Sequence, residues 1–136
     1  MAFKLSITVQ NAILDVVETT IGASAVLKLY DLTAGAPAEP EDAIVATILA
    51  TISLPADWMG AAAANSKALS GTWQDASADG TGTADFFRLF ATDGTTCHAQ
   101  GTVTATGGGG DMTVDNTSLV AGQVFSVTTF TLTAGN

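Results

Sequence analysis

An alternation of apolar and polar side chains over residues 44–54 limits the folds open to this chain more than any other feature. The apolar phase consists of Ile44, Ala46, Ile48, Ala50, Ile52 and Leu54. Successive side chains of a strand point to opposite faces, so a period of two predicts a strand with one buried face. Residues 25–30 repeat the pattern. The proline- and acid-rich residues 34–42 between the two segments predict an exposed loop.

Further strands are predicted in the second half of the chain. Residues 87–91 and 96–104 alternate on either side of Asp93-Gly94. Asp-Gly between two such runs is a strong signal for a β-hairpin. A short strand is expected at residues 112–114, and the glycines before it, 107–110, are interpreted as a flexible hairpin tip.

The last apolar segment changes phase. Phe125 and Val127 lie on one phase of a strand, whereas Phe130 and Leu132 lie on the other. An extra residue between the two pairs would keep all four side chains inside. We therefore predict a β-bulge, or a bend that carries the chain from one sheet to another, near Thr128.

One helix is predicted, over residues 11–21. Its apolar side chains recur at helical spacing, at Ile13, Leu14, Val17 and Ile21. Asn11 is expected to cap its start, and Gly22 to follow its end. A strand is the alternative interpretation, because several side chains of residues 16–20 are β-branched.

These elements predict a mainly β fold, namely a single-domain antiparallel β-sandwich or jelly roll of about seven strands with one short N-terminal helix. The domain is expected to cover residues 11–136. Residues 1–10 are expected to form an N-terminal arm or an edge strand. A chain of 136 residues suits one domain of this kind.

Charge narrows the choice of partners. The chain has 4 Lys and Arg residues against 13 Asp and Glu residues, a net charge of -9, and only 12% of its residues are charged. The four cations form no basic stripe, so neither nucleic acid nor a membrane is an expected partner. Neither a secretory signal nor a transmembrane helix is expected. Cys97 is the one cysteine of the sequence, so no intramolecular disulfide can form.

The sequence offers little material for catalysis. His98 is the one histidine, and its neighbour Cys97 resembles a nucleophile. On a strand, however, adjacent side chains point to opposite faces, so the sheet would separate Cys97 from His98. The spacing of the carboxylates favours no catalytic pair. We expect no enzyme activity, no catalytic residues and no cofactor.

The best candidate for a metal site is the segment that begins at Asp75. Asp75, Ser77, Asp79 and Gly80 match four positions of a calcium-binding EF-hand loop. The position that requires a bidentate Glu holds Phe86. We therefore expect an Asp/Gly-rich turn and no metal site, and cation binding by Asp75 and Asp79 stays an open alternative.

Exposed apolar side chains offer the remaining candidates for binding. One set alternates along the N-terminal segment and consists of Phe3, Leu5, Ile7 and Val9. Such a segment can add a strand to the sheet of another subunit, or it can be an edge strand of its own domain. Trp58 and Met59 follow Pro55 in a predicted loop, either as a plug over the end of the sandwich or as an interface anchor.

Several stretches of the chain carry a resemblance to a known family. They are NAILDVVETTIGASAVLKLYD (11–31), LATISLP (49–55), DASADGTGTADFFRLF (75–90) and VAGQVFSVTTFTLTAGN (120–136). Together they resemble small structural proteins encoded among the head genes of tailed bacteriophages, in particular capsid cement or decoration proteins. The resemblance implies a non-enzymatic, jelly-roll-like virion protein on the capsid exterior. Its expected partners are the major capsid protein, at contacts between capsomers, and further copies of itself in a dimer or trimer.

Two other functions stay open at this point. One is a carbohydrate- or receptor-binding β-module of a phage fibre or adhesin, for which Trp58, Trp73 and Tyr30 are the aromatic candidates. The other is a different structural protein of the head or tail.

Overall fold

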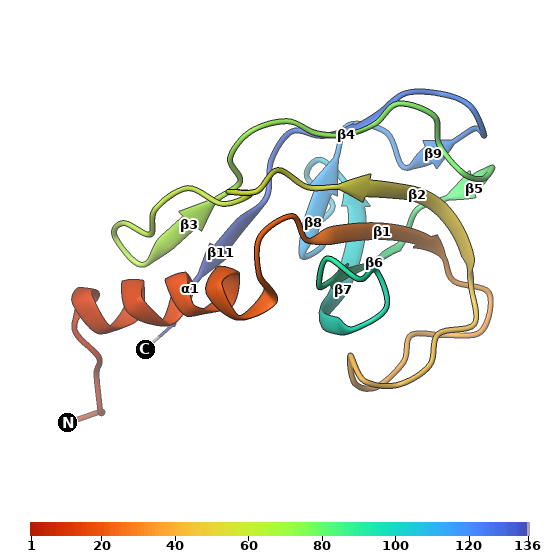
Figure 1. Ribbon diagram of the computed structural model, residues 1–136. Helices are drawn as coiled ribbons and strands as arrows, with labels where there is room; N and C mark the ends of the chain where they lie inside the picture. Colours follow the sequence, from red (N-terminus) through yellow and green to blue (C-terminus); the bar gives the residue numbers. More distant parts are fainter. Residues whose placement is uncertain (136) are drawn as a thin grey trace.

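The computed structural model describes residues 1–135 and contains a central five-stranded sheet (Figure 1). In spatial order its strands are β2 (Thr47–Ser53), β1 (Val26–Asp31), β6 (Phe86–Phe90), β7 (Cys97–Ala105) and β8 (Met112–Val114). All neighbouring pairs are antiparallel except β7 and β8, which are parallel.

The other strands form three antiparallel two-stranded ladders. These are β4 (Trp73–Asp75) with β10 (Phe125–Val127), β3 (Ser66–Ala68) with β11 (Thr131–Thr133), and β5 (Gly82–Thr83) with β9 (Ser118–Leu119). Side chains from the sheet and from the ladders share one hydrophobic core. The fold is therefore mainly β and consistent with a β-sandwich, as predicted, with more and shorter strands than the expected seven.

The prediction for residues 44–54 is only partly correct, because β2 contains a bulge. Leu29 pairs with Ala50 and Tyr30 with Ile48, so Leu49 is an extra residue on β2. The bulge reverses the phase of the strand. Leu49 is therefore fully buried, whereas Ile48, which was expected inside, is 38% exposed.

The hairpin at Asp93-Gly94 is confirmed, since β6 and β7 pair on either side of it. Asp93 fixes the turn by accepting hydrogen bonds from the backbone N–H groups of Thr95 and Thr96 and from the Thr96 hydroxyl. Gly94 has a φ of 68°, a conformation that glycine adopts without strain.

The glycine-rich segment 107–110 does not form the predicted hairpin tip, because β8 runs parallel to β7. The loop instead wraps around Thr104, whose hydroxyl accepts a hydrogen bond from the N–H of Gly110. A Cβ atom on Gly108 would lie 2.7 Å from the Thr104 Cβ. Glycine is required there by close packing.

The predicted change of sheet near Thr128 is confirmed. β10 pairs with β4, the chain then bends, and β11 pairs with β3. The bend brings Phe125, Val127 and Phe130 into the core despite their opposite phases.

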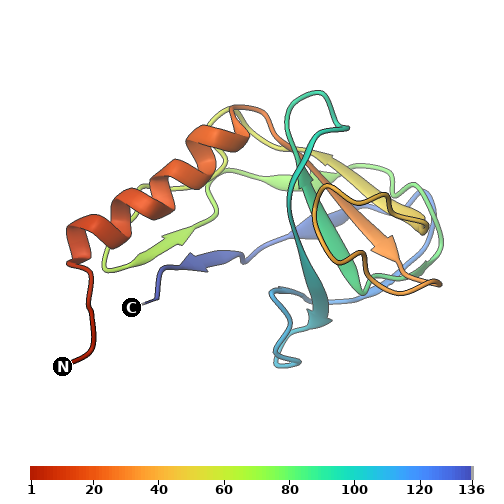
Figure 2. The ribbon, with the colours of Figure 1, turned by 90° about the horizontal axis from the view of Figure 1, so that it is seen from below.

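The helix α1 (Ile7–Ile21) begins earlier than the predicted residue 11. Ser6 is its N-cap, and the Ser6 Oγ accepts a hydrogen bond from the Val9 N–H at 3.3 Å. Residues 7–10 are therefore helical, so the arm or edge strand predicted for residues 1–10 is wrong beyond Ser6. Gly22 ends the helix, as expected. In Figure 2, α1 runs along one side of the molecule and the N-terminus extends past its first turn.

Candidate interaction surface

One face of α1, the inner face, is fixed to the β-structure by apolar contacts. Leu14 and Ile21 are 4% and 5% exposed, and Val17 packs against the core. Ile13, which the sequence placed on the same face, is 47% exposed. The longer helix shows why: its buried stripe runs through residues 10, 14, 17 and 21, and Ile13 lies beside that stripe.

A buried lysine holds the same helix from the side. Lys67 on β3 is 4% exposed, and its Nζ lies 2.8 Å from Asp15 Oδ1, 3.0 Å from Glu18 Oε2 and 2.7 Å from the Gly60 carbonyl oxygen. Burial alone would lower the pKa of Lys67, but the hydrogen bonds to Asp15 and Glu18 raise it above its ordinary value. The Lys67 ammonium in turn lowers the pKa of Asp15. Lys67 therefore stays charged and ties α1 to β3.

Trp58 and Met59 also fix α1, and neither is an exposed interface anchor. Trp58 is fully buried, and its indole N–H donates a hydrogen bond to the Gly22 carbonyl oxygen at 3.0 Å. Met59 is 1% exposed, and its backbone N–H donates to Glu18 Oε1. Burial of both side chains argues against their direct contact with a partner and favours the plug interpretation.

A second side of α1, next to the inner face, is apolar and exposed, and we call it the outer face. It consists of Val9, Ala12, Ile13 and Val16. Val9, Ile13 and Val16 are 44%, 47% and 58% exposed. Among the described residues, those that line this shallow groove, including its continuation to Thr20 and His98, carry no carboxylate, lysine or arginine.

The sequence contains a signal for the outer face. Val9, Ile13 and Val16 follow each other at spacings of four and three, which is helical spacing. Val9 also alternates with Phe3, Leu5 and Ile7, and this second pattern predicts a strand.

Residues 1–6 extend beyond α1 as an N-terminal segment. Phe3 is 83% exposed, and each of the other eight aromatic side chains is at most 6% exposed. Leu5 is half-buried, and its carbonyl oxygen accepts a hydrogen bond from the buried Gln10 side chain at 2.8 Å. Of the predicted partner-binding residues in this part of the chain, Phe3, Ile7 and Val9 are exposed, the last two on the helix.

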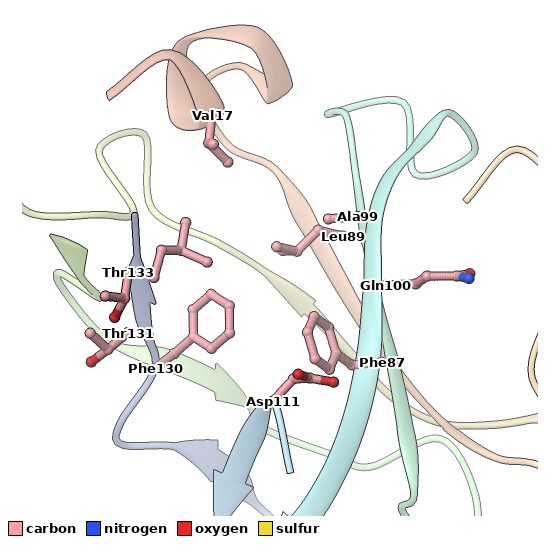
Figure 3. A pocket seen from close by; sticks show the side chains of 10 residues that line it. Val17, Phe87, Leu89, Ala99, Gln100, Asp111, Phe130, Thr131 and Thr133 are labelled. Atoms are coloured by element: carbon pink, nitrogen blue, oxygen red, sulfur yellow. The ribbon is translucent and has the colours of Figure 1, made fainter. Parts of the chain in front are cut away.

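A cleft of about 260 Å³ lies between α1, the five-stranded sheet and β11 (Figure 3). Its apolar lining comes from Val17, Phe87, Leu89, Ala99, Phe130 and Leu132. Asp111 lies at its edge, and β11 lines one side with Thr131 and Thr133. The exposed Asp111 carboxylate accepts hydrogen bonds from the Thr102 N–H and hydroxyl, which lower the pKa of Asp111.

Cys97 and His98 do not form a joint site. Cys97 is half-buried on β7, its thiol donates to the Ala99 carbonyl oxygen, and burial raises its pKa. His98 is exposed and borders the outer face of α1. Within residues 1–135, no three His, Cys, Asp or Glu side chains are grouped closely enough to hold a metal ion.

The carboxylates of the EF-hand-like segment face β2. Asp75 accepts hydrogen bonds from the backbone N–H groups of Thr51 and Ser77, and Asp79 accepts one from the Thr51 hydroxyl at 2.6 Å. A Cβ atom on Gly80 would lie 2.7 Å from the Ile48 carbonyl oxygen. Packing against β2 therefore explains why Asp75, Asp79 and Gly80 stand at these positions.

The aromatic residues considered for sugar binding are buried. Trp58, Trp73 and Tyr30 are 0%, 1% and 3% exposed. The rings of Trp58, Trp73, Phe130 and Phe87 pack one against the next in that order, with neighbouring centroids 5.6–6.0 Å apart. None of the three offers an open platform for a sugar ring, so that premise of the carbohydrate-binding alternative is wrong.

Comparison with family models, with curated proteins and with solved structures found no match to this chain. Among the described residues there is no helix with the length and hydropathy needed to cross a membrane.

Proposed function

We propose that this protein is a structural virion protein, a cement or decoration protein that binds the outside of an assembled phage head. Its partner on the shell is the major capsid protein, at contacts between capsomers. It works without catalysis, by shape and apolar contact. The observation that carries the proposal is the outer face of α1, an uncharged apolar stripe on the surface of a highly acidic protein.

The outer face suits attachment because contacts with the β-structure fix the position of α1. Lys67 and Trp58 fix α1 to the β-structure, so an outer-face contact orders no new segment. Pre-ordering of this kind lowers the entropic cost of binding. Apolar side chains in a fixed arrangement favour a partner that is itself rigid, such as an assembled shell.

The size of the outer face indicates that one copy binds weakly. Burying a Val or Ile side chain completely contributes about 1.5–3 kcal/mol. Val9, Ile13 and Val16 are each about half exposed, so their burial contributes roughly 2–5 kcal/mol, against an association cost of about 4–15 kcal/mol. Retention on a shell therefore requires further contacts or several linked copies, and a dimer or trimer would supply them by avidity.

A ligand that binds only the assembled shell stabilises that shell by mass action. This is the stabilising mechanism we propose for the protein.

The test is the protein composition of purified particles from the virus that encodes the chain. We expect an abundance close to that of the shell protein, since a cement protein binds at many equivalent positions. Absence from particles, or an abundance suited to a single vertex or to the tail, would overturn the proposal in favour of another role.

A further inference from the structure

We propose that the cleft between α1 and β11 binds the Phe3 side chain of a second copy of this chain. The N-terminal segment of one molecule would then dock against the β-structure of another. This contact is separate from the outer face of α1 and gives the protein a way to self-associate before any shell is present.

The cleft has the size and lining for an aromatic ring. An apolar cavity of about 150 Å³ is large enough to bind benzene, and this cleft measures about 260 Å³. Phe87 and Phe130 already contact each other there at 5.8 Å between centroids, edge to face. A third ring can join such a pair in the same favoured geometry. Phe3 is the one exposed aromatic side chain among the described residues.

Charge favours a second copy of the chain as the source of this ring. Lys4 follows Phe3 directly and is exposed, and all 13 carboxylate residues of the chain lie beyond residue 14. The other cations are engaged within the fold: Lys67 with Asp15 and Glu18, Arg88 with Gln100, and Lys28 with the Gly94 carbonyl oxygen. The N-terminal segment is therefore apolar and basic, whereas the rest of the chain carries all the carboxylates. One of them, Asp111, lies at the edge of the cleft, where it would attract Lys4 of a second copy.

Phe3 does not line the cleft of its own molecule. Ser6 caps α1, and Gln10 holds the Leu5 carbonyl oxygen, so both residues are fixed. The two residues from Leu5 to Phe3 span at most about 7 Å. Val17, which lines the cleft, lies about 15 Å along the helix from Ile7. Figures 1 and 2 both show the N-terminus directed away from the rest of the molecule.

The first test measures self-association of the purified chain by analytical ultracentrifugation. Phe3→Ala removes the ring, and Ala99→Phe or Thr133→Trp fills the cleft from the strand or from its rim. Each variant should weaken self-association by about tenfold to a hundredfold, the loss expected for one buried aromatic side chain. Val124→Ala is the matched control, because Val124 is 59% exposed elsewhere on the surface. It should associate like the wild type.

Mixing variants tests whether the contact runs between molecules. Phe3→Ala retains an open cleft, and Ala99→Phe retains the ring, so the two variants should associate with each other more tightly than either associates with itself. Thr133→Trp can replace Ala99→Phe if that variant does not fold. A wild type that stays monomeric at its highest soluble concentration, or a Phe3→Ala variant that associates normally, would overturn the proposal.

A photocrosslinking residue at position 3 identifies the occupant directly. In a mixture of isotopically light and heavy chains, crosslinks from position 3 should join the two forms and fall on residues that line the cleft. Crosslinks within one chain, or to another surface, would overturn the proposal. No shell is present in these experiments, so a negative result would overturn self-association through Phe3 without affecting the proposed function. Conversely, absence of the protein from virions would overturn the proposed function without affecting self-association.

Discussion

The inner and outer faces of α1 carry the same kind of side chain but have different surroundings. Leu14 and Ile21 on the inner face are almost fully buried, whereas Ile13 and Val16 on the outer face are about half exposed. Burial of the inner face is driven by the chain's own core. The outer face retains apolar surface after folding, and this is the surface that we propose for attachment.

The largest expected effect comes from removing the indole that supports the end of α1. Trp58→Ala would leave a cavity beside Trp73 and remove the hydrogen bond to the Gly22 carbonyl oxygen. We expect the free energy of unfolding to fall by about 3–5 kcal/mol, measured by denaturant titration. A loss below about 1 kcal/mol would show that the region behind α1 contributes little to stability.

A smaller effect is expected from Lys67→Met, which removes the cation that ties α1 to β3. Glu18, 17% exposed at its side chain, would lose its cationic partner, and the Gly60 carbonyl oxygen would lose its side-chain donor. We expect a loss of about 1–3 kcal/mol in the free energy of unfolding. Lys4→Met is the control, since Lys4 is exposed, and it should leave stability unchanged. Equal effects of the two variants would contradict the role given to Lys67.

Outer-face substitutions should lower stability less than loss of Trp58. Ile13→Ser and Val16→Ser replace side chains that the fold leaves about half exposed. We expect each to lower the free energy of unfolding by about 1 kcal/mol, since roughly half of each side chain is already buried, and Val45→Ser in the loop before β2, where Val45 is 74% exposed, to lower it by less. A loss near that of Trp58→Ala would mean that the outer face serves folding and would remove the contrast between the two faces.

The smallest effect concerns Asp93, in a turn remote from both faces. Hydrogen bonds from the Thr96 hydroxyl and from the Thr96 and Thr95 N–H groups lower its pKa from 3.8 to about 2. The pKa is lowered on folding, so the ionised carboxylate stabilises the turn above about pH 4, and this contribution is lost as the pH falls toward 2. Asp93→Asn should therefore be slightly less stable than the wild type at pH 7. Denaturation curves should converge between pH 4 and 2, and a constant difference would contradict the assignment.

Local signals in the sequence predicted those elements whose residues lie close together in the chain. The Asp93-Gly94 turn and the phase change before Phe130 each arise within a few residues, and both predictions are confirmed. The bulge at Leu49 was missed because Ile48 and Leu49 are both apolar, so the pattern alone does not show which one faces the core. Register against β1 decides between them.

The candidate site was predicted less well, because it depends on long-range contacts. Lys67 and Asp15 are separated by 52 residues, and no local pattern pairs them. The sequence predicts too late a start for α1 because residues 3–9 fit a strand period equally well, whereas in the structure Ser6 caps the helix. Once α1 begins at Ile7, Val9 joins Ile13 and Val16, and the outer face becomes visible.

The most direct test of the central claim is binding to undecorated phage shells, measured by cosedimentation of the wild type, Ile13→Ser/Val16→Ser and Val45→Ser. If the outer face of α1 is the attachment surface, the wild type and Val45→Ser will saturate the shells at a copy number near that of the shell protein. The double variant will stay in the supernatant although it remains folded, as its denaturation curve will show. Equal retention of the double variant and the wild type would contradict the account.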